Sequence, residues 1–256
     1  VGLDVWDTGY NYANFQYMGT GHMDPMWLFS TYLANVAGNF LMKLPSGGTL
    51  MGMNLYTGLT VSIMALVGYF FCTRKLNMPP ILAFVGEMAA VSLCWCPTAL
   101  LYNYMTYLFF LLSSVLLYLG LTGEKKAFLF LAGVFLGANV LVRFSNLPEA
   151  AMILAVWAYD LILWREEKAG RVSGQEQSGK GVLARMGRHT LWCLAGYVAA
   201  AVMLFVGIEI RYGFGEYAEG IRRLFAMTEN ASDYEAISML KGILRIYVEN
   251  LYWVIR

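Results

Sequence analysis

The first 24 residues carry three carboxylates and a histidine in a segment rich in aromatic side chains. Asp4 and Asp7 are three residues apart, so they share a face on a helix and can converge on one site in a loop. Neighbouring aromatic rings favour a carboxylate with a raised pKa, which suits a general base near neutral pH. These residues predict proton-abstraction chemistry, with Asp7 as the base and Asp4 supporting it.

Three further side chains of this segment are candidates for binding a substrate. His22 and Asp24 close the segment, and Tyr10 follows Asp7 by three residues. Imidazole and carboxylate groups also ligate divalent metal ions, so a metal-assisted site is a candidate, with metal identity and metal dependence left open. The alternative, that the acids only solvate an exposed loop, also stays open.

Composition places this acidic segment beside a membrane. Hydrophobic residues make up 59% of the 256-residue chain and charged residues only 14%, whereas soluble domains carry about 25% charged residues. The net charge of +1 and the lack of a basic patch exclude a nucleic-acid partner. The chain starts at Val1 and stops at Arg256 within an amphipathic pattern, so we expect it to be part of a longer protein.

Long uncharged runs predict an all-α fold, a polytopic bundle of six transmembrane helices. A bilayer core needs about 20 apolar residues per helix. Pro97 splits one long run into two, because proline interrupts helical hydrogen bonding. Gly133 and Gly137 are four apart and predict a close helix approach. The expected helices cover residues 50–71, 80–96, 100–121, 127–142, 150–164 and 191–210.

Basic residues alternate between the connecting segments and predict the orientation. One side holds Arg74, Lys75, Lys125, Lys126, Arg165, Lys168, Arg171, Lys180, Arg185 and Arg188, and the other side's short segments hold only Lys43 and Arg143. The first side is therefore expected to be cytoplasmic, in a bacterial plasma membrane.

Three regions follow from this orientation. Residues 1–49 form an extracytoplasmic acidic loop with an amphipathic interfacial helix over Met26–Phe40. Residues 50–210 form the six-helix region, with a cytoplasmic linker at 165–189. Residues 211–256 are an extracytoplasmic amphipathic segment that is truncated, with an apolar stripe over Tyr234–Arg256.

Two charged side chains lie in or at the apolar runs. Glu87 falls inside the second run, where an unpaired charge costs on the order of 3 kcal/mol. We expect it to be protonated or hydrogen-bonded to a bundle residue such as Asn54, Asn139 or Ser92. Arg143 ends the fourth run at headgroup level, where a guanidinium either binds a phosphate or only extends to the interface.

The order of these features resembles the glycosyltransferase C superfamily, in particular its bacterial protein O-mannosyltransferase-like and lipid A aminoarabinose transferase-like members. The resemblance rests on DTGY at 7–10, HMDPMWL at 22–28 and AGVFLGANVLVRFSNL at 132–147, and it covers roughly residues 4–165. Thr8 replaces the second acid of the family's motif, and Met23 with Asp24 interrupts its HPPL run.

The resemblance implies a membrane glycosyltransferase that takes a sugar from a polyprenyl-phosphate donor and passes it to an extracytoplasmic glycan, lipid or protein acceptor. Asp7 and Asp4 then act in catalysis, Arg143 holds the donor phosphate, and Tyr10, His22 and Asp24 contact substrate. Two alternatives remain open. One is a proton-coupled transporter or lipid flippase centred on Glu87, and the other is a noncatalytic subunit of an envelope-assembly complex.

Overall fold

The computed structural model describes residues 7–21, 23–93, 100–169 and 179–229, together with Arg245 and Glu249. Every regular element in these ranges is a helix, as the sequence predicts. The described segments are α1 (Asp7–Tyr17), α2 (Pro25–Ser30), α3 (Tyr32–Met42), α4 (Leu50–Arg74), α5 (Pro80–Leu93), α6 (Tyr102–Thr122), α7 (Lys126–Val142), the 3₁₀ helix η1 (Phe144–Ile153), α8 (Leu154–Lys168), α9 (Gly179–Tyr212) and α10 (Glu216–Glu229).

Four of the described segments are long and apolar enough to cross a membrane. They are Leu50–Arg74, Tyr102–Thr122, Phe144–Lys168 and Gly181–Tyr212, and two shorter apolar helices cover Pro80–Val91 and Lys126–Val142. Large apolar side chains are exposed along these helices, for example Leu59 on α4 and Val202 on α9. A bilayer covers such side chains, so the chain is compatible with a membrane protein.

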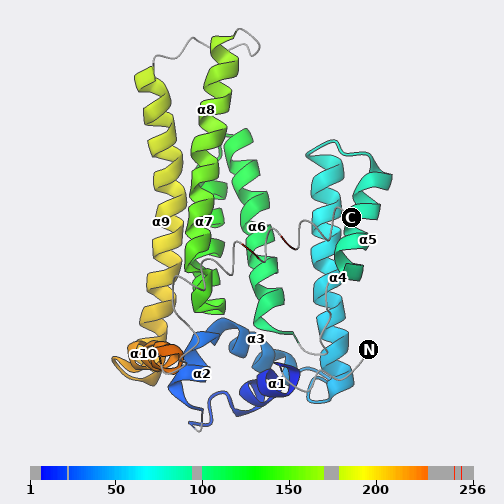
Figure 1. The fold of residues 1–256 in the computed structure, drawn as a ribbon, viewed down its shortest axis with the longest axis vertical. Helices are drawn as coiled ribbons and strands as arrows, with labels where there is room; N and C mark the ends of the chain where they lie inside the picture. Colours follow the sequence, from blue (N-terminus) through cyan, green and yellow to red (C-terminus); the bar gives the residue numbers. More distant parts are fainter. Residues whose placement is uncertain are drawn as a thin grey trace.

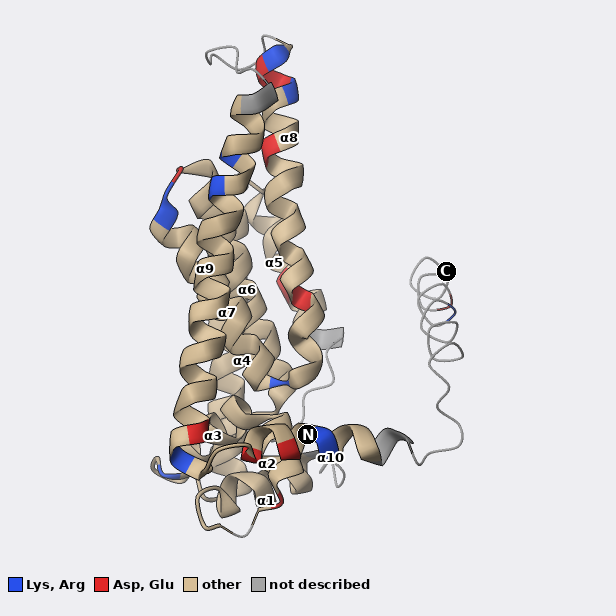
Figure 2. Cartoon of the chain, turned by 90° about the vertical axis from the view of Figure 1, so that its left-hand side faces the viewer, with Lys and Arg blue, Asp and Glu red and all other residues tan. Residues whose placement is uncertain are grey.

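The helices form an elongated bundle with one end covered by short helices. Figure 1 shows α4, α6, α7, α8 and α9 running along the long axis, with α1, α2, α3 and α10 lying across one end. We call this the capped end, and the opposite end, where α8 stops at Lys168 and α9 starts at Gly179, the hairpin end. Charged residues gather towards both ends, and most of the length between them is uncharged (Figure 2).

The path of the chain agrees with the predicted alternation of the loops. The acidic segment that contains α1–α3 and the segment after Arg211 that contains α10 both lie at the capped end (Figure 1). An ion pair joins them, with 3.0 Å between Arg223 Nη1 and Asp24 Oδ2. Gly220 allows the close contact of α10 with α2, because a Cβ there would lie only 2.9 Å from the Pro25 carbonyl carbon.

Several predicted helix boundaries were wrong. The single helix expected over 26–40 is two helices that break at Thr31, where the backbone leaves the helical region (φ −136°, ψ 43°). Asn35 stabilises the break by donating to Trp27 O and Leu28 O at 3.1 and 3.3 Å. Gly38 is not the interruption, since it lies inside α3 against the Phe15 ring.

The fifth and sixth predicted helices also differ from the structure. The fifth begins as a 3₁₀ helix from Phe144, with Pro148 inside it, and becomes an α-helix only at Leu154. Proline cannot donate the hydrogen bond that a regular α-helix requires there. The sixth begins at Gly179, about three turns before the expected start at residue 191. Polar residues of that extension are buried against α8, which hydropathy alone does not anticipate.

The tightest helix contact joins α7 to α9, and the predicted glycine pair makes it possible. A Cβ on Gly133 would lie 2.8 Å from the Cys193 carbonyl carbon, and a Cβ on Gly137 would lie 2.9 Å from that of Tyr197. Gly196 meets the backbone of Phe130 in the same way. The prediction from GVFLG is therefore confirmed, and this contact fixes the position of the end of α7, where Arg143 follows.

Candidate functional site

Helix α1 begins at Asp7 and is anchored to the bundle by its second half. Phe15 is fully buried in an apolar cluster with Met53, Leu101 and Tyr104. Asn39 of α3 donates to Phe15 O at 2.7 Å, and the Tyr12 hydroxyl donates to Gly48 O. The start of α1 is thus held at the capped end. The side chain of Asp7 lies outside what the structure describes, and so do Asp4 and His22 altogether.

Arg143 follows the last residue of α7, and its side chain is presented outwards at the capped end. Its extended backbone (φ −155°, ψ 124°) ends the helix while its N–H still bonds Asn139 O at 3.2 Å. The guanidinium lies over the Tyr102 ring, 4.9 Å from the centroid, and Nη1 donates to Asn103 Oδ1 at 3.4 Å. Its Nε and Nη2 make no hydrogen bond to any residue that the structure describes, so they are available to an anion.

The two remaining candidates of the acidic segment make contacts within the fold. Asp24 caps α2 by accepting from Met26 N at 2.9 Å, and its other oxygen binds Arg223. Tyr10 packs edge-on against Trp27, with 4.9 Å between ring centroids. These contacts give Asp24 a structural role in joining α2 to α10. A substrate role for Asp24 or Tyr10 stays a prediction.

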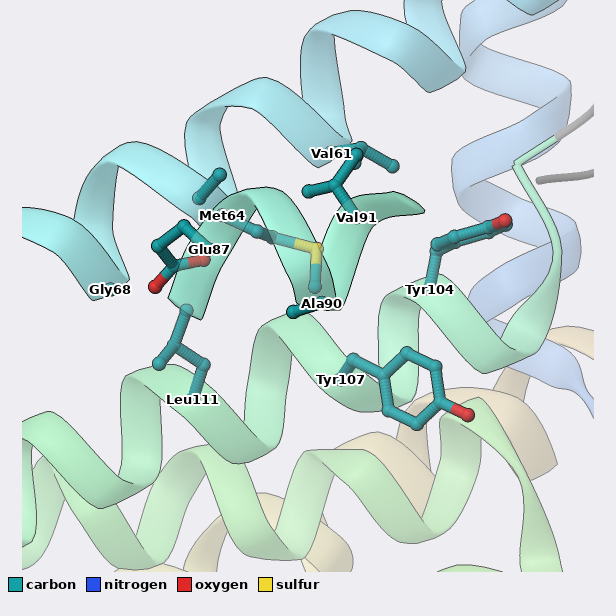
Figure 3. Close-up of a pocket in the computed structure, with 10 residues that line it drawn as sticks. Val61, Met64, Gly68, Glu87, Ala90, Val91, Tyr104, Tyr107 and Leu111 are labelled. Atoms are coloured by element: carbon teal, nitrogen blue, oxygen red, sulfur yellow. The ribbon is translucent and has the colours of Figure 1, made fainter. Parts of the chain in front are cut away.

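Glu87 points into a cavity of about 240 Å³ between α4, α5 and α6. Figure 3 shows its carboxylate beside Gly68 of α4 and Leu111 of α6, with Tyr104 and Tyr107 towards the other end of the cavity. Gly68 makes room for the acid, since a Cβ there would lie 3.1 Å from Glu87 Cδ.

The expected hydrogen-bond partners of Glu87 are not found. The Asn139 amide binds Glu149 instead, and Glu87 makes no hydrogen bond to any described residue, Asn54 included. The side chain of Ser92 lies outside the described part of the chain.

Sequence reasoning missed a polar network where α6, α7 and η1 meet. Asn139 Nδ2 donates to Glu149 Oε2 at 2.6 Å and to Thr106 O at 3.3 Å. Asn146 Nδ2 donates to Thr106 Oγ1 at 2.8 Å and to Asn139 O at 3.1 Å. Asn139 is fully buried and Glu149 is half-buried. The signal in the sequence was an acid six residues after Arg143, between two apolar runs.

A second missed group is a buried ion cluster that joins α8 to α9. Asp160 is fully buried, with 3.3 Å between Oδ1 and Arg185 Nε and 3.0 Å between Oδ2 and His189 Nδ1. Arg185 Nη1 also binds Glu167 Oε1 at 3.0 Å. The signal was the spacing of Arg185 and His189, which puts both on one face of a helix. This cluster lies towards the hairpin end, away from the acidic segment.

The described residues contain no group of three or more His, Cys, Asp or Glu side chains placed to hold a metal ion. No protein-family model, curated protein or solved structure matches the chain.

Proposed function

We propose that the chain is part of a membrane glycosyltransferase that uses a polyprenyl-phosphate sugar donor. The observation that carries the proposal is the role of residues 100–104 at the start of α6. Leu100, Leu101 and Tyr104 lie in one buried apolar cluster with Phe15 of α1. Tyr102 and Asn103 contact Arg143. One short segment therefore positions both the helix that opens with the candidate base and the candidate phosphate ligand.

The proposed roles follow from the chemistry of each group. Arg143 binds the donor phosphate and stabilises the charge that grows on it as the sugar leaves, through paired hydrogen bonds from the planar guanidinium. Asp7 takes the proton of the acceptor hydroxyl as that oxygen attacks the anomeric carbon. Asp4 supports Asp7 or binds a metal ion. A lipid phosphate is already a suitable leaving group, so positioning and electrostatics supply much of the acceleration.

The proposal includes a topology. All six apolar helices cross the membrane, and the capped end faces away from the cytoplasm, because the short connections at the hairpin end carry most of the basic residues. Helices α1–α3 and α10 then lie in the interface, where a lipid-linked substrate meets an extracytoplasmic acceptor. Aromatic residues are enriched at such interfaces, and Tyr10, Trp27, Tyr32 and Tyr217 all lie on these four helices.

The base is tested by sugar transfer from a polyprenyl-phosphate donor, measured with the full-length protein. Asp7→Asn retains size and most hydrogen bonding but cannot accept a proton at neutral pH. Turnover should fall about 100-fold or more, the usual contribution of general base catalysis. Expression and donor binding should stay near wild-type, and full transfer by this variant would remove Asp7 as the base.

The phosphate ligand is tested with Arg143→Lys in the same assay. Lysine retains the charge but loses the planar pair of donors and the broad stacking on Tyr102. The apparent affinity for the donor should therefore weaken more than that for the acceptor. An unchanged donor affinity would show that Arg143 only extends to the interface.

The cavity at Glu87 favours a second candidate function, a transporter or flippase. Such a protein needs an acid on its substrate path, and Glu87 lines a half-open cavity between α4, α5 and α6. The two functions predict opposite orders of effect. In the glycosyltransferase Glu87→Gln is mild and Asp7→Asn is severe, whereas in the transporter Glu87 is indispensable and Asp7 is dispensable.

A further inference from the structure

The polar network beside Arg143 fixes the orientation of the Asn139 amide. Its amino group faces two acceptors, Glu149 Oε2 at 2.6 Å and Thr106 O at 3.3 Å. The reverse orientation would bring the amide oxygen against the Thr106 carbonyl oxygen and the ionised Glu149 carboxylate, so it is disfavoured. Asn139 Oδ1 is therefore fixed on the opposite side of the amide. It is buried and has no hydrogen-bond partner among the described residues.

Two more groups of this region have unused hydrogen-bonding capacity among the described residues. The Tyr197 hydroxyl on α9 is buried and makes no hydrogen bond to any described residue, and Tyr197 packs on the apolar cluster that contains Leu136 of α7 and Val156 of α8. The Glu149 carboxylate accepts one hydrogen bond from the described residues, although a carboxylate can accept about four. The region thus offers unused acceptor oxygens, and buried polar groups are normally satisfied. It is suited to a ligand that brings several donors.

The position of the network relates it to Arg143. Asn139 is one helical turn, about 6 Å, before Arg143 along α7. Asn103 and Thr106 of α6 are also one turn apart, and they bind Arg143 and Asn146 respectively. Arg143 offers a positive charge at the capped end, and Asn139 and Glu149 offer acceptor oxygens about one helical turn further into the bundle. This arrangement suits a ligand whose anionic group is attached to a small group rich in hydroxyls or amines.

We propose that Glu149, Asn139 and Tyr197 form a binding site for the hydroxyl or amino groups of the donor sugar, with its phosphate on Arg143. This inference rests on the proposed function and adds a sugar-recognition site to it. A site built to pair with hydroxyl groups rejects a ligand that lacks them, because its own acceptors then stay unpaired. The free chain accordingly carries unpaired acceptors at this place.

The test measures binding of defined lipids to the full-length protein in nanodiscs. The probes are decaprenyl phosphate and decaprenyl phosphate that carries a hexose or a pentose. Wild-type protein should bind at least one sugar-bearing lipid more tightly than the bare lipid. Glu149→Gln should weaken that binding about tenfold and leave binding of the bare lipid unchanged. Arg143→Gln should weaken binding of both.

Tyr197→Phe separates sugar binding from folding. It removes a hydroxyl that bonds nothing in the described fold, so thermal stability should be retained or rise, while affinity for the sugar-bearing lipid falls about threefold or more. Equal affinity of wild type, Glu149→Gln and Tyr197→Phe for the sugar-bearing lipid would overturn the inference and assign the space to water. If wild-type protein bound none of the lipids, the proposed function itself would fail.

Discussion

Replacing Gly137 by alanine should open the contact between α7 and α9. The new Cβ would lie 2.9 Å from the Tyr197 carbonyl carbon and 3.0 Å from its Cα, whereas carbon atoms pack at about 3.5–4.0 Å. Since the obstacle is backbone, which cannot rotate away, the helices must separate by roughly 1 Å. Each atom pair at the contact then loses up to about half of its van der Waals attraction. For about 50 atom pairs at 0.1–0.2 kcal/mol each, the loss is about 3 kcal/mol.

Alanine also favours the helix itself, by about 1 kcal/mol over glycine, so the net loss is about 2 kcal/mol. For a chain of this size the melting temperature should then fall by about 4–8 °C. The measurement is thermal unfolding of the purified protein in one detergent, followed by tryptophan fluorescence.

Gly207→Ala on α9 is the matched control, because nothing lies within 4 Å of a Cβ at that position. This variant gains helix propensity without a clash and should melt at or slightly above the wild-type temperature. If Gly137→Ala were as stable as Gly207→Ala, then glycine would not be what allows α7 and α9 to approach, and the reasoning would be refuted.

Three further predictions address topology, the ion cluster and pH. In intact cells, a cysteine at Thr20 should react with a membrane-impermeant reagent and one at Gly174, outside the described residues, should not; labelling at position 174 would reverse the orientation. Asp160→Asn should cost about 3 kcal/mol in unfolding experiments, because it removes the fully buried carboxylate that pairs with both Arg185 and His189 and leaves Arg185 with Glu167 alone; a loss below 1 kcal/mol would contradict this. Hydrogen bonds from two arginines lower the pKa of Glu219 from 4.5 to about 2, so the stability that ionised Glu219 gives α10 is complete above about pH 4.5 and is lost as pH falls towards 2. The protection of α10 amides from hydrogen exchange, corrected for the intrinsic exchange rate at each pH, should decrease over that interval, and should not do so when Glu219 is replaced by glutamine.

The sequence was sufficient to predict where several helices begin, because those helices start at or within long uncharged runs. The starts of α4 and α5 coincide with the expected residues, and the start of α7 differs by one. The pairing of Gly133 and Gly137 with a partner helix was also predictable, although its identity as α9 was not. Boundaries failed where polar side chains decide them, as at Thr31, where Asn35 binds the carbonyls of the preceding helix.

The candidate site was predictable only in part, for a related reason. The position of Arg143 at the end of α7 follows from charge and hydropathy, and the structure places it as expected. Its neighbours Tyr102 and Asn103 come from another helix, about 40 residues away, so only the packed bundle reveals them. The same holds for Asn139, which the sequence offered as one of three possible partners of Glu87 and which binds Glu149 in the structure.

The ion cluster between α8 and α9 has a consequence for how the chain is made. Asp160 leaves the ribosome 25 residues before Arg185, its main partner, and it lies within an apolar segment that is a candidate membrane span. If α8 crosses the membrane as proposed, it carries an unpaired acid until α9 follows, at a cost of about 3 kcal/mol. On that topology we expect the insertion machinery to retain α8 until α9 emerges and to release the two helices together, with Asp160 paired to Arg185.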